Sequence, residues 1–283
     1  MREVAPSRPE VDAETLRRCL ATLHHAPGGI VTDIDGTISA IAPTPSEARV
    51  DDTARRALQR LASRLAVVGV VSGRAAVDGE AMVGLPAVIY IGNHGMERRH
   101  LGTRWAHPGA VASQASITAA LAEIAAEAVR RGADDGMIVE NKGLSGTVHY
   151  RLAADPEGVR AALLPIAVAA AQAHGLVVTE GRLIVEVRPS IVVNKGTALV
   201  DLAAEYRLQG MIFLGDDLTD VDGFVALRTL REHDALATLR VGVLGAETHP
   251  RVREEIDVSV QGVAACAALL EAIADGLDAA RSG

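Results

Sequence analysis

The sequence is poor in aromatic residues, and this shortage restricts both its partners and its core. Its 283 residues include 2 Phe, 1 Trp and 3 Tyr. Proteins usually bind single-stranded nucleic acid by stacking bases on aromatic rings, so such a role is disfavoured. Lys and Arg number 28 against 36 Asp and Glu, and the net charge of −8 offers little attraction to a polyanion. We therefore expect no nucleic-acid partner and a core built from Ala, Val, Leu and Ile.

Cysteine is also scarce, and long apolar stretches are missing. Cys19 and Cys266 stand near opposite ends of the chain among apolar, helix-like residues, which favours buried free thiols over a disulfide or a metal site. The longest aliphatic stretch, 161–171, contains Pro165 and is shorter than the roughly 18 residues that a membrane span needs. Residues 1–10 lack the basic and then apolar pattern of a signal peptide. The sequence thus predicts a soluble, cytoplasmic protein with no membrane partner.

Apolar runs with strand character alternate with helical patterns in the first part of the chain. Continuous apolar runs occur at 29–32, 65–71 and 87–91, and 51–65 has the apolar spacing of a helix. Uninterrupted apolar strands are typical of a parallel sheet that helices cover on both faces. The same alternation returns later, in helices and strands expected at 194–206, 211–214, 218–230, 240–243 and 263–277.

The middle of the chain has a different pattern, in which short strands in pairs interleave with long helices. These elements are expected at 112–131, 136–140, 143–151, 155–173, 176–179 and 182–187. Turn-forming residues join the strands of each pair, as in hairpins. Hairpins combined with helices suggest a small α+β domain with an antiparallel sheet. We therefore predict an α/β domain of residues 1–106 and 190–283, interrupted by an inserted α+β domain at 107–189.

Two dense clusters of carboxylates follow predicted strands. Asp33 and Asp35 come directly after the first strand, whereas Asp216 and Asp217 follow a later one, with Asp220 in the same run. Ligands of open α/β sheets bind beyond the carboxyl ends of the strands. Clustered carboxylate oxygens suit Mg²⁺ and not zinc. Taken singly, the first cluster is also compatible with an ordinary turn and the second with an acidic helix start.

Two further side chains are suited to holding an anion near these acids. Ser72 ends the strand at 65–71 and offers a hydroxyl beside closely spaced backbone N–H groups, although Ser is also a common helix cap. Lys195 lies in the first turn of a predicted helix, where the helix dipole disfavours a cation. A lysine at that position therefore suggests a functional role, although an ordinary exposed surface lysine is the alternative.

In their order along the chain, these elements resemble the four motifs of the haloacid dehalogenase superfamily of phosphohydrolases. The turn with Asp33 and Asp35 comes first, followed by Ser72, Lys195 and the pair that starts at Asp216. The inserted segment lies between Ser72 and Lys195, where the larger-cap members of the superfamily carry their cap domain. The resemblance implies a Rossmann-like parallel-sheet core with an inserted α+β cap domain.

Within this superfamily the sequence most closely resembles the trehalose-6-phosphate phosphatases, over roughly residues 32–224. The similar segments are Asn93-His94-Gly95 with Glu97, Glu140-Asn141-Lys142, Val148-His149-Tyr150-Arg151, Glu186-Val187-Arg188-Pro189 and Asn194-Lys195-Gly196. Val221 departs from the family pattern, which commonly has another acid there, and this leaves the surroundings of the metal in doubt. Ile34 replaces a common Phe, which should matter little.

The resemblance implies a Mg²⁺-dependent phosphatase that converts trehalose 6-phosphate into trehalose and phosphate, in trehalose biosynthesis. Asp33 would attack phosphorus and form an aspartyl phosphate, and Asp35 would act first as acid and then as base. Ser72 and Lys195 would hold the phosphoryl oxygens. The expected metal ligands are Asp33, the backbone carbonyl of Asp35 and Asp216, with Asp217 and Asp220 around them.

Sugar recognition is expected where the inserted domain faces the core. By family likeness, the contacts would come from Arg74, Asn93, His94, Glu140, Lys142 and Glu186. Glu and Lys on exposed strands also form ordinary solvated pairs, so a structural role is the alternative. The substrate is a small sugar phosphate, and the resemblance leaves room for a functional link to a trehalose-6-phosphate synthase.

Three other functions share parts of this pattern. A related capped phosphatase for a glycosyl phosphoglycerate or sucrose phosphate would have the same core residues and differ in the cap. A sugar phosphomutase would need a bisphosphate activator and would release no phosphate. A phosphoacceptor signalling module also places acids, a Ser or Thr and a Lys at strand ends, but it is much shorter and has no inserted domain.

Overall fold

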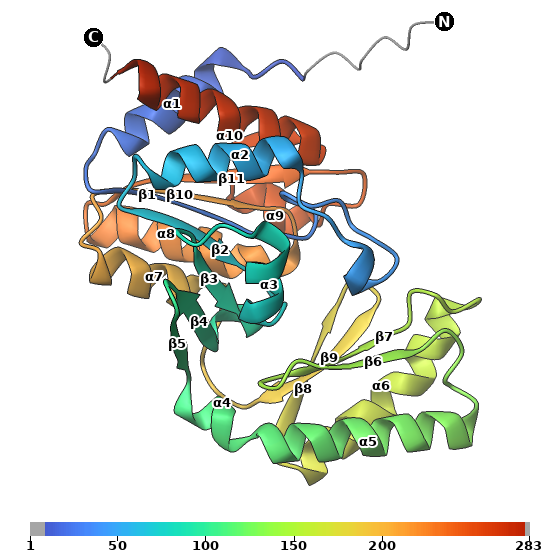
Figure 1. The fold of residues 1–283 in the computed structure, drawn as a ribbon. Coiled ribbons are helices and arrows are strands. Elements are labelled where there is room, and N and C mark those ends of the chain that lie inside the picture. Colours follow the sequence, from blue (N-terminus) through green and yellow to red (C-terminus); the bar gives the residue numbers. More distant parts are fainter. Residues whose placement is uncertain (1–8, 281–283) are drawn as a thin grey trace, which may run out of the picture.

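Two β-sheets organise the computed structural model, which describes residues 9–280 (Figure 1). The larger sheet has eight strands in the order β12-β11-β10-β1-β2-β3-β4-β5. These strands are β1 (Gly28–Thr32), β2 (Val67–Val71), β3 (Ile89–Gly92), β4 (Glu97–His100), β5 (Thr103–Ala106), β10 (Gly210–Gly215), β11 (Ala237–Leu244) and β12 (Val258–Gln261). The predicted core domain includes residues 1–8 and 281–283, and the absence of a signal-peptide pattern was inferred partly from residues 1–8. Both stretches lie outside the described residues.

The larger sheet is parallel over most of its width, as predicted. Strands β1, β2, β3, β10, β11 and β12 run parallel to one another, whereas β4 and β5 add an antiparallel hairpin next to β3 at one edge. The sequence analysis missed this hairpin. Its strands are half-buried or exposed and carry charged side chains, so they lack the continuous apolar run that marks a strand buried on both faces.

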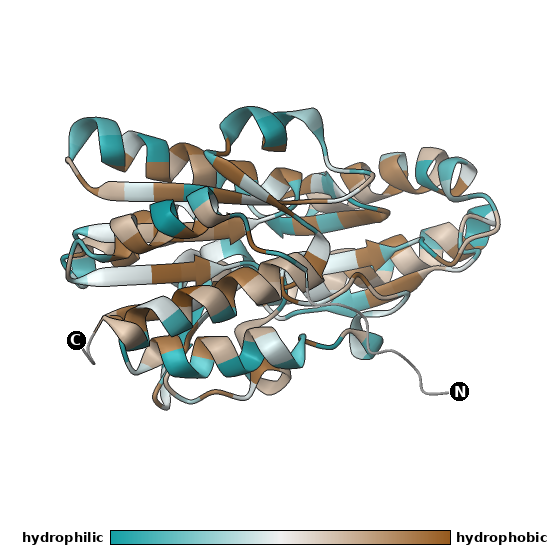
Figure 2. Ribbon diagram, turned by 90° about the horizontal axis from the view of Figure 1, so that it is seen from above, coloured by the Kyte–Doolittle hydropathy of each residue, from teal (hydrophilic) through white to brown (hydrophobic). Residues whose placement is uncertain are grey.

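Helices cover both faces of the larger sheet. One face packs on α1 (Ala13–Leu23), α2 (Asp52–Ala62), α3 (Ala76–Val83) and α10 (Gly262–Ala279), and the other on α7 (Lys195–Glu205), α8 (Val221–His233) and α9 (Pro250–Glu255). Hydrophobic residues run along the strands, whereas the helices carry hydrophobic and hydrophilic residues in alternation (Figure 2). Buried Ala, Val, Leu and Ile dominate both cores, and Cys19 and Cys266 are buried free thiols, as predicted.

The smaller sheet lies within the predicted inserted segment. It is antiparallel, in the order β6-β7-β9-β8, with β6 (Ile138–Asn141), β7 (Gly146–His149), β8 (Leu176–Gly181) and β9 (Ile184–Pro189). The helices of this segment are α4 (Pro108–Ala112), α5 (Gln114–Arg131) and α6 (Pro156–Ala173). Helices α5 and α6 pack on one face of the sheet, and the other face turns toward the larger sheet (Figure 1). That residues 107–189 form a separate domain stays a prediction.

Local sequence explains where several helices begin. The carboxylate of Asp51 accepts hydrogen bonds from the backbone N–H groups of Thr53 and Ala54 and caps α2. Asp155 caps α6, whose first residue is a proline, and Asn194 caps α7. Within residues 9–280, no helix is both long enough and apolar enough to cross a membrane.

Candidate active site

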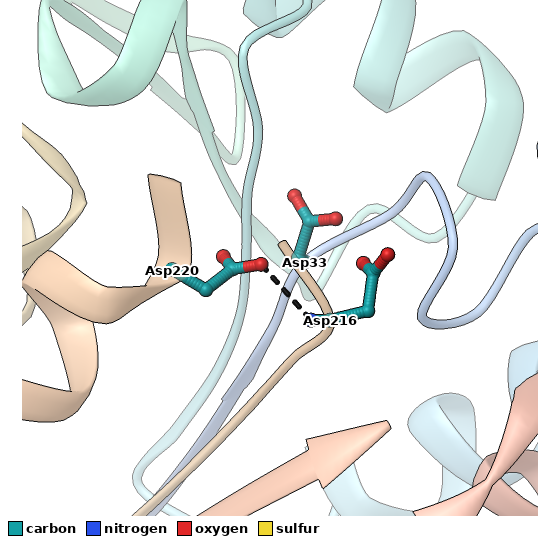
Figure 3. A group of neighbouring side chains, drawn as sticks. All are labelled: Asp33, Asp216 and Asp220. Atoms are coloured by element: carbon teal, nitrogen blue, oxygen red, sulfur yellow. Dashed lines mark hydrogen bonds between the residues drawn. The ribbon is translucent and has the colours of Figure 1, made fainter. Parts of the chain in front are cut away.

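Three carboxylates meet where β1 and β10 end (Figure 3). Asp33 follows β1, and Asp216 and Asp220 follow β10, its parallel neighbour. One oxygen of each acid lies within 4.8 Å of the others. Gly36 allows this approach, because it has a φ of +92° and a Cβ there would lie 2.0 Å from Oδ2 of Asp216. The two acidic clusters of the sequence therefore form one site.

Lys195 joins two of these acids from the first turn of α7. Its Nζ donates to Oδ1 of Asp33 and to Oδ1 of Asp220, each at 2.7 Å, and all three side chains are buried. The other oxygen of Asp220 accepts the backbone N–H groups of Asp216 and Asp217, both at 3.0 Å. Asp220 thus orients the lysine and the turn after β10, a role that explains why a short 3₁₀ turn, η3 (Leu218–Asp220), precedes α8.

Asp33 and Asp216 have oxygen atoms left for a cation. Oδ1 of Asp216 accepts the hydroxyl of Thr37 at 2.9 Å, and Asp33 binds Lys195 through one oxygen only. A donor set made of carboxylate oxygens alone suits a hard divalent ion such as Mg²⁺. Asp217 is not part of this set, because its carboxylate caps η3 by accepting the N–H of Leu218 at 2.6 Å.

The crowded acids carry more negative charge than Lys195 balances. Burial and the neighbouring acids Asp220 and Asp35 raise the pKa of Asp33 to about 7, although Lys195 opposes this. Burial and the charge of Asp33 raise the pKa of Asp216 to about 9. Burial by itself would lower the pKa of Lys195, but Asp220 and Asp33 outweigh it and raise that pKa. The lysine therefore stays charged, while the acids favour a proton or a cation.

Stabilisation by Mg²⁺ is expected to grow with pH. Because the pKa values of Asp33 and Asp216 lie above the usual 3.8, the folded chain holds more protons than the unfolded chain between about pH 4 and 9. The resulting penalty is absent below pH 4 and complete above pH 9. A divalent cation relieves it, so the rise in Tm with Mg²⁺ should be larger at pH 8.5 than at pH 5.5. An Asp216→Asn variant should show a smaller trend, and a Tm rise independent of pH would contradict the prediction.

Asp35 pairs with Arg74. Nε and Nη2 of Arg74 each donate to a separate carboxylate oxygen at 2.7 Å, and Nη1 donates to the carbonyl of Pro45 at 3.0 Å. Ser72 is buried at the end of β2, next to β1, and its hydroxyl accepts the N–H of Arg74 at 3.2 Å. The structure thus gathers Asp33, Asp35, Ser72 and Lys195 at one edge of the sheet.

Asn93 and His94 form a turn after β3 that holds the core against the smaller sheet. Both have left-handed backbone, with φ of 49° and 57°. Asn93 is fully buried, and its side chain donates to Glu97 at 2.6 Å and accepts from Ser145 at 2.8 Å. These contacts show that Asn93 supports the turn, and its predicted contact with a sugar stays a prediction. Glu97 and Ser145 were assigned no role from the sequence, since only the fold shows that they reach Asn93.

Glu186, on β9, is the centre of the contact between the two sheets. His94 lies 3.4 Å from one of its oxygens, and Ser145 and Lys142 lie 3.0 and 3.6 Å from the other. Burial alone would raise the pKa of Glu186, but His94 and Lys142 outweigh burial and hold that pKa well below its usual range. Lys142 also donates to the carbonyl of Gly73 at 2.9 Å, so the smaller sheet reaches the loop after β2.

Glu140, on β6, lies in the same region with a different partner. His149 of the neighbouring strand β7 lies 2.8 Å from its carboxylate. Burial alone would raise the pKa of Glu140, but His149, Lys142 and Arg74 outweigh it and lower that pKa. His149 was assigned no function from the sequence. It lies two residues along β7 from Thr147, the residue opposite Glu140, and so faces the same side of the sheet.

The two lysines of the chain, Lys142 and Lys195, both lie in this region. Every other basic side chain among the 28 Lys and Arg residues is an arginine. A lysine ammonium is a compact point charge, whereas a guanidinium is a planar fork of donors, so the two are not interchangeable at a crowded site. The absence of lysine from the rest of the sequence was therefore a second signal for this site.

Comparisons with known proteins point to one family. A family model described as trehalose-phosphatase matches residues 31–249. The chain is 38% identical over 199 residues to the trehalose-phosphate phosphatase of Mycobacterium tuberculosis, which covers 68% of the chain and 49% of that protein. The chain thus spans about half the length of the curated relatives it matches.

Solved structures show the same fold. The C-terminal domain of a C. albicans trehalose-6-phosphate phosphatase superposes with a TM-score of 0.74 at 22% identity, covering 95% of this chain and 98% of that one. A trehalose-6-phosphate phosphatase related protein has a TM-score of 0.69 at 23% identity, covering 90% and 100%. The predicted fold class, a parallel α/β core with an inserted α+β cap, is confirmed.

Proposed function

The chain belongs to the trehalose-phosphatase family, and we propose that it hydrolyses trehalose 6-phosphate to trehalose and phosphate, as a step of trehalose biosynthesis. One observation carries the proposal. Buried Asp33 lies at the end of β1 between Lys195 and a second acid, Asp216. Together these residues would supply a nucleophile, a fixed positive charge and the oxygen ligands of a cation, which phosphoryl transfer requires.

Mg²⁺ is the cofactor that the oxygen donors favour. Asp33, Asp216 and the backbone carbonyl of Asp35 would hold it, with Asp217 and Asp220 supporting the turn around it. When bound, the ion neutralises charge on the phosphoryl group and orients it. Val221, where the family commonly has an acid, is the first residue of α8 and packs in the core.

Hydrolysis would proceed in two displacement steps at phosphorus, in which the protein's own residues have separate roles. Asp33 forms a bond to phosphorus as the bond from phosphorus to the sugar oxygen breaks, and Asp35 gives that oxygen a proton. In the second step Asp35 takes a proton from water, whose oxygen attacks phosphorus and releases Asp33. Lys195 and Ser72 would bind the phosphoryl oxygens throughout. Two hydrogen bonds from Arg74, each 2.7 Å long, fix the orientation of the Asp35 carboxyl group.

We assign sugar recognition to the face where the smaller sheet meets the core, with residues 107–189 as a cap domain. Glu140, Lys142 and Glu186 would contact the sugar from the cap, and Arg74 and His94 from the core. Asn93 would act indirectly, through the turn it supports. A functional link to a synthase and a cytoplasmic location stay predictions.

A panel of phosphate esters tests the proposed function. Phosphate release would be measured with trehalose 6-phosphate, sucrose 6-phosphate, glucose 6-phosphate and 4-nitrophenyl phosphate, each with Mg²⁺ and with a chelator. Trehalose 6-phosphate should have the highest kcat/KM, and the chelator should abolish turnover. A higher kcat/KM for another sugar phosphate would reassign the substrate, and labelling without turnover would indicate a phosphoacceptor module.

Replacing Glu140 by Ala should impair the sugar ester selectively. Truncating one partner of a charged contact in a closed site typically costs about 2–5 kcal/mol, so kcat/KM for trehalose 6-phosphate should fall at least about tenfold. Hydrolysis of 4-nitrophenyl phosphate, which has no sugar, should stay within about threefold. Glu180→Ala is a matched control, because Glu180 pairs with Arg160 on the exposed surface of the same sheet. Equal losses on both substrates would point to a structural role for Glu140.

A further inference from the structure

A straight row of polar side chains crosses all four strands of the smaller sheet. Glu140 lies opposite Thr147, Thr147 opposite Glu186, and Glu186 opposite Thr179. Directly paired residues point to the same face of a sheet, and their neighbours along each strand point to the other. The neighbouring valines of β7 and β9 pack with α5 and α6. The polar row therefore lies on the face that turns toward the catalytic core.

Thr147 differs from the rest of the row. Glu140 binds His149, Glu186 accepts from Ser145, and the hydroxyl of Thr179 donates to Glu186 at 3.4 Å. The hydroxyl of Thr147 is fully buried and has no hydrogen-bond partner among residues 9–280. Buried polar atoms without a partner are rare, because they lose their hydrogen bonds to water without replacement. Such an atom inside a proposed binding face points to a missing ligand.

The neighbours of Thr147 indicate what that ligand is. Glu140 and Glu186 are ionised acids that can only accept hydrogen bonds, so they suit the hydroxyl protons of a sugar. The Thr147 hydroxyl between them can donate, and so suits a sugar oxygen. A sugar with alternating hydroxyl donors and oxygen acceptors would match all three. Separation of the cap from the core, where Lys142 meets Gly73, would give the sugar access to this row.

We propose that Thr147 is a specificity-determining residue whose hydroxyl donates a hydrogen bond to the sugar part of the substrate, between Glu140 and Glu186. This inference rests on the proposed sugar-phosphatase function. It adds a neutral donor, buried in the middle of the sheet, to the charged side chains that the family resemblance implies.

Thr147→Val tests the proposal, because valine keeps the shape and removes the hydroxyl. For trehalose 6-phosphate, kcat/KM should fall about three- to tenfold, the range for one neutral hydrogen bond. For 4-nitrophenyl phosphate it should not change, and Tm should not fall, since no internal hydrogen bond is lost. Thr147→Ser keeps the hydroxyl and should stay within about twofold of the wild type on both substrates.

Thr238→Val is the matched control. Thr238 is also a buried threonine on a strand, but its hydroxyl donates to the carbonyl of Leu227 at 3.0 Å, within the core of the larger sheet. Its replacement should lower Tm and leave the ratio of kcat/KM values for the two substrates unchanged. Comparing the two variants therefore distinguishes the loss of a hydroxyl with an internal hydrogen bond, at Thr238, from the loss of the Thr147 hydroxyl, which has none within residues 9–280.

Two results would overturn the inference. Unchanged kcat/KM on both substrates, with a higher Tm for Thr147→Val, would show a hydroxyl without a ligand. Equal losses on both substrates would show a structural role. Failure of the proposed function looks different, because the wild type itself would then turn over trehalose 6-phosphate poorly. The Thr147→Val variant would in that case be compared with the wild type on the sugar phosphate that the wild type hydrolyses best. If the wild type hydrolyses no sugar phosphate better than 4-nitrophenyl phosphate, both proposals are wrong.

Discussion

Replacing Asp33 by Asn should reduce turnover of trehalose 6-phosphate by about three orders of magnitude or more. An amide cannot attack phosphorus as a carboxylate does, and a lost nucleophile removes the covalent route altogether. The Asn side chain has nearly the same size, and Lys195 keeps Asp220 as its second partner. The variant should therefore fold, with a cooperative melting transition. Release of phosphate under single-turnover and steady-state conditions is the measurement.

The control for this change is a surface acid. Asp52 lies at the start of α2 and pairs with Arg55 in solvent, so Asp52→Asn should keep full activity. Retention of more than a few per cent of the wild-type rate in the Asp33→Asn protein would remove Asp33 from the nucleophile's role. Loss of the melting transition would instead show that the carboxylate is needed for folding.

Replacing Lys195 by Met should have the second large effect, on both stability and activity. The change leaves Asp33 and Asp220 buried without their common cation, and breaking such a pair typically costs about 3–5 kcal/mol of unfolding free energy. Activity should fall at least about a hundredfold, because the same charge would stabilise the phosphoryl group in the transition state. Denaturant unfolding with a chelator present, and phosphate release with Mg²⁺, would measure the two effects.

The stability loss of Lys195→Met should depend on pH. Protonation of the two abandoned carboxylates removes their charge, so the difference from the wild type should be largest near pH 8 and smaller near pH 5. A loss that is the same at both pH values would indicate that packing of the lysine stem, and not its charge, is what matters. Arg64→Met, which breaks an exposed pair with Asp278, should cost no more than about 1 kcal/mol at either pH.

Much of this site could be predicted because parallel strands all end at the same edge of a sheet. Asp33, Ser72 and Asp216 each follow an apolar run, and parallel strands bring their carboxyl ends to one edge whatever the order in which they pair. The inserted segment was also recognisable, since its hairpins and helices differ from the apolar strands around it. The resemblance to a family then suggested catalytic and binding roles for individual residues, which the hydrophobic pattern alone cannot indicate.

The sequence could not show which of several neighbouring polar residues takes which place in the site. Asp217 and Asp220 are equally acidic in sequence, but the turn after β10 directs one to a backbone cap and the other to Lys195. Asn93 has the side chain of a sugar ligand, yet the left-handed turn buries it against Glu97. Such outcomes depend on backbone direction at single residues, and composition does not encode that direction.

The amino-acid sequence by itself determined that the chain forms a parallel α/β core with an inserted α+β segment, and that acids gather at the ends of its strands. Hydrophobic periodicity decides these features because burial of apolar strands and helices is their main driving force. Only the tertiary structure decided that Arg74 holds Asp35 and that Ser145 reaches Asn93 across the two sheets. It also decided that the Thr147 hydroxyl finds no hydrogen-bond partner within residues 9–280. Hydrogen bonds are short and directional, so they depend on positions that the whole fold must set before any pair of residues can meet.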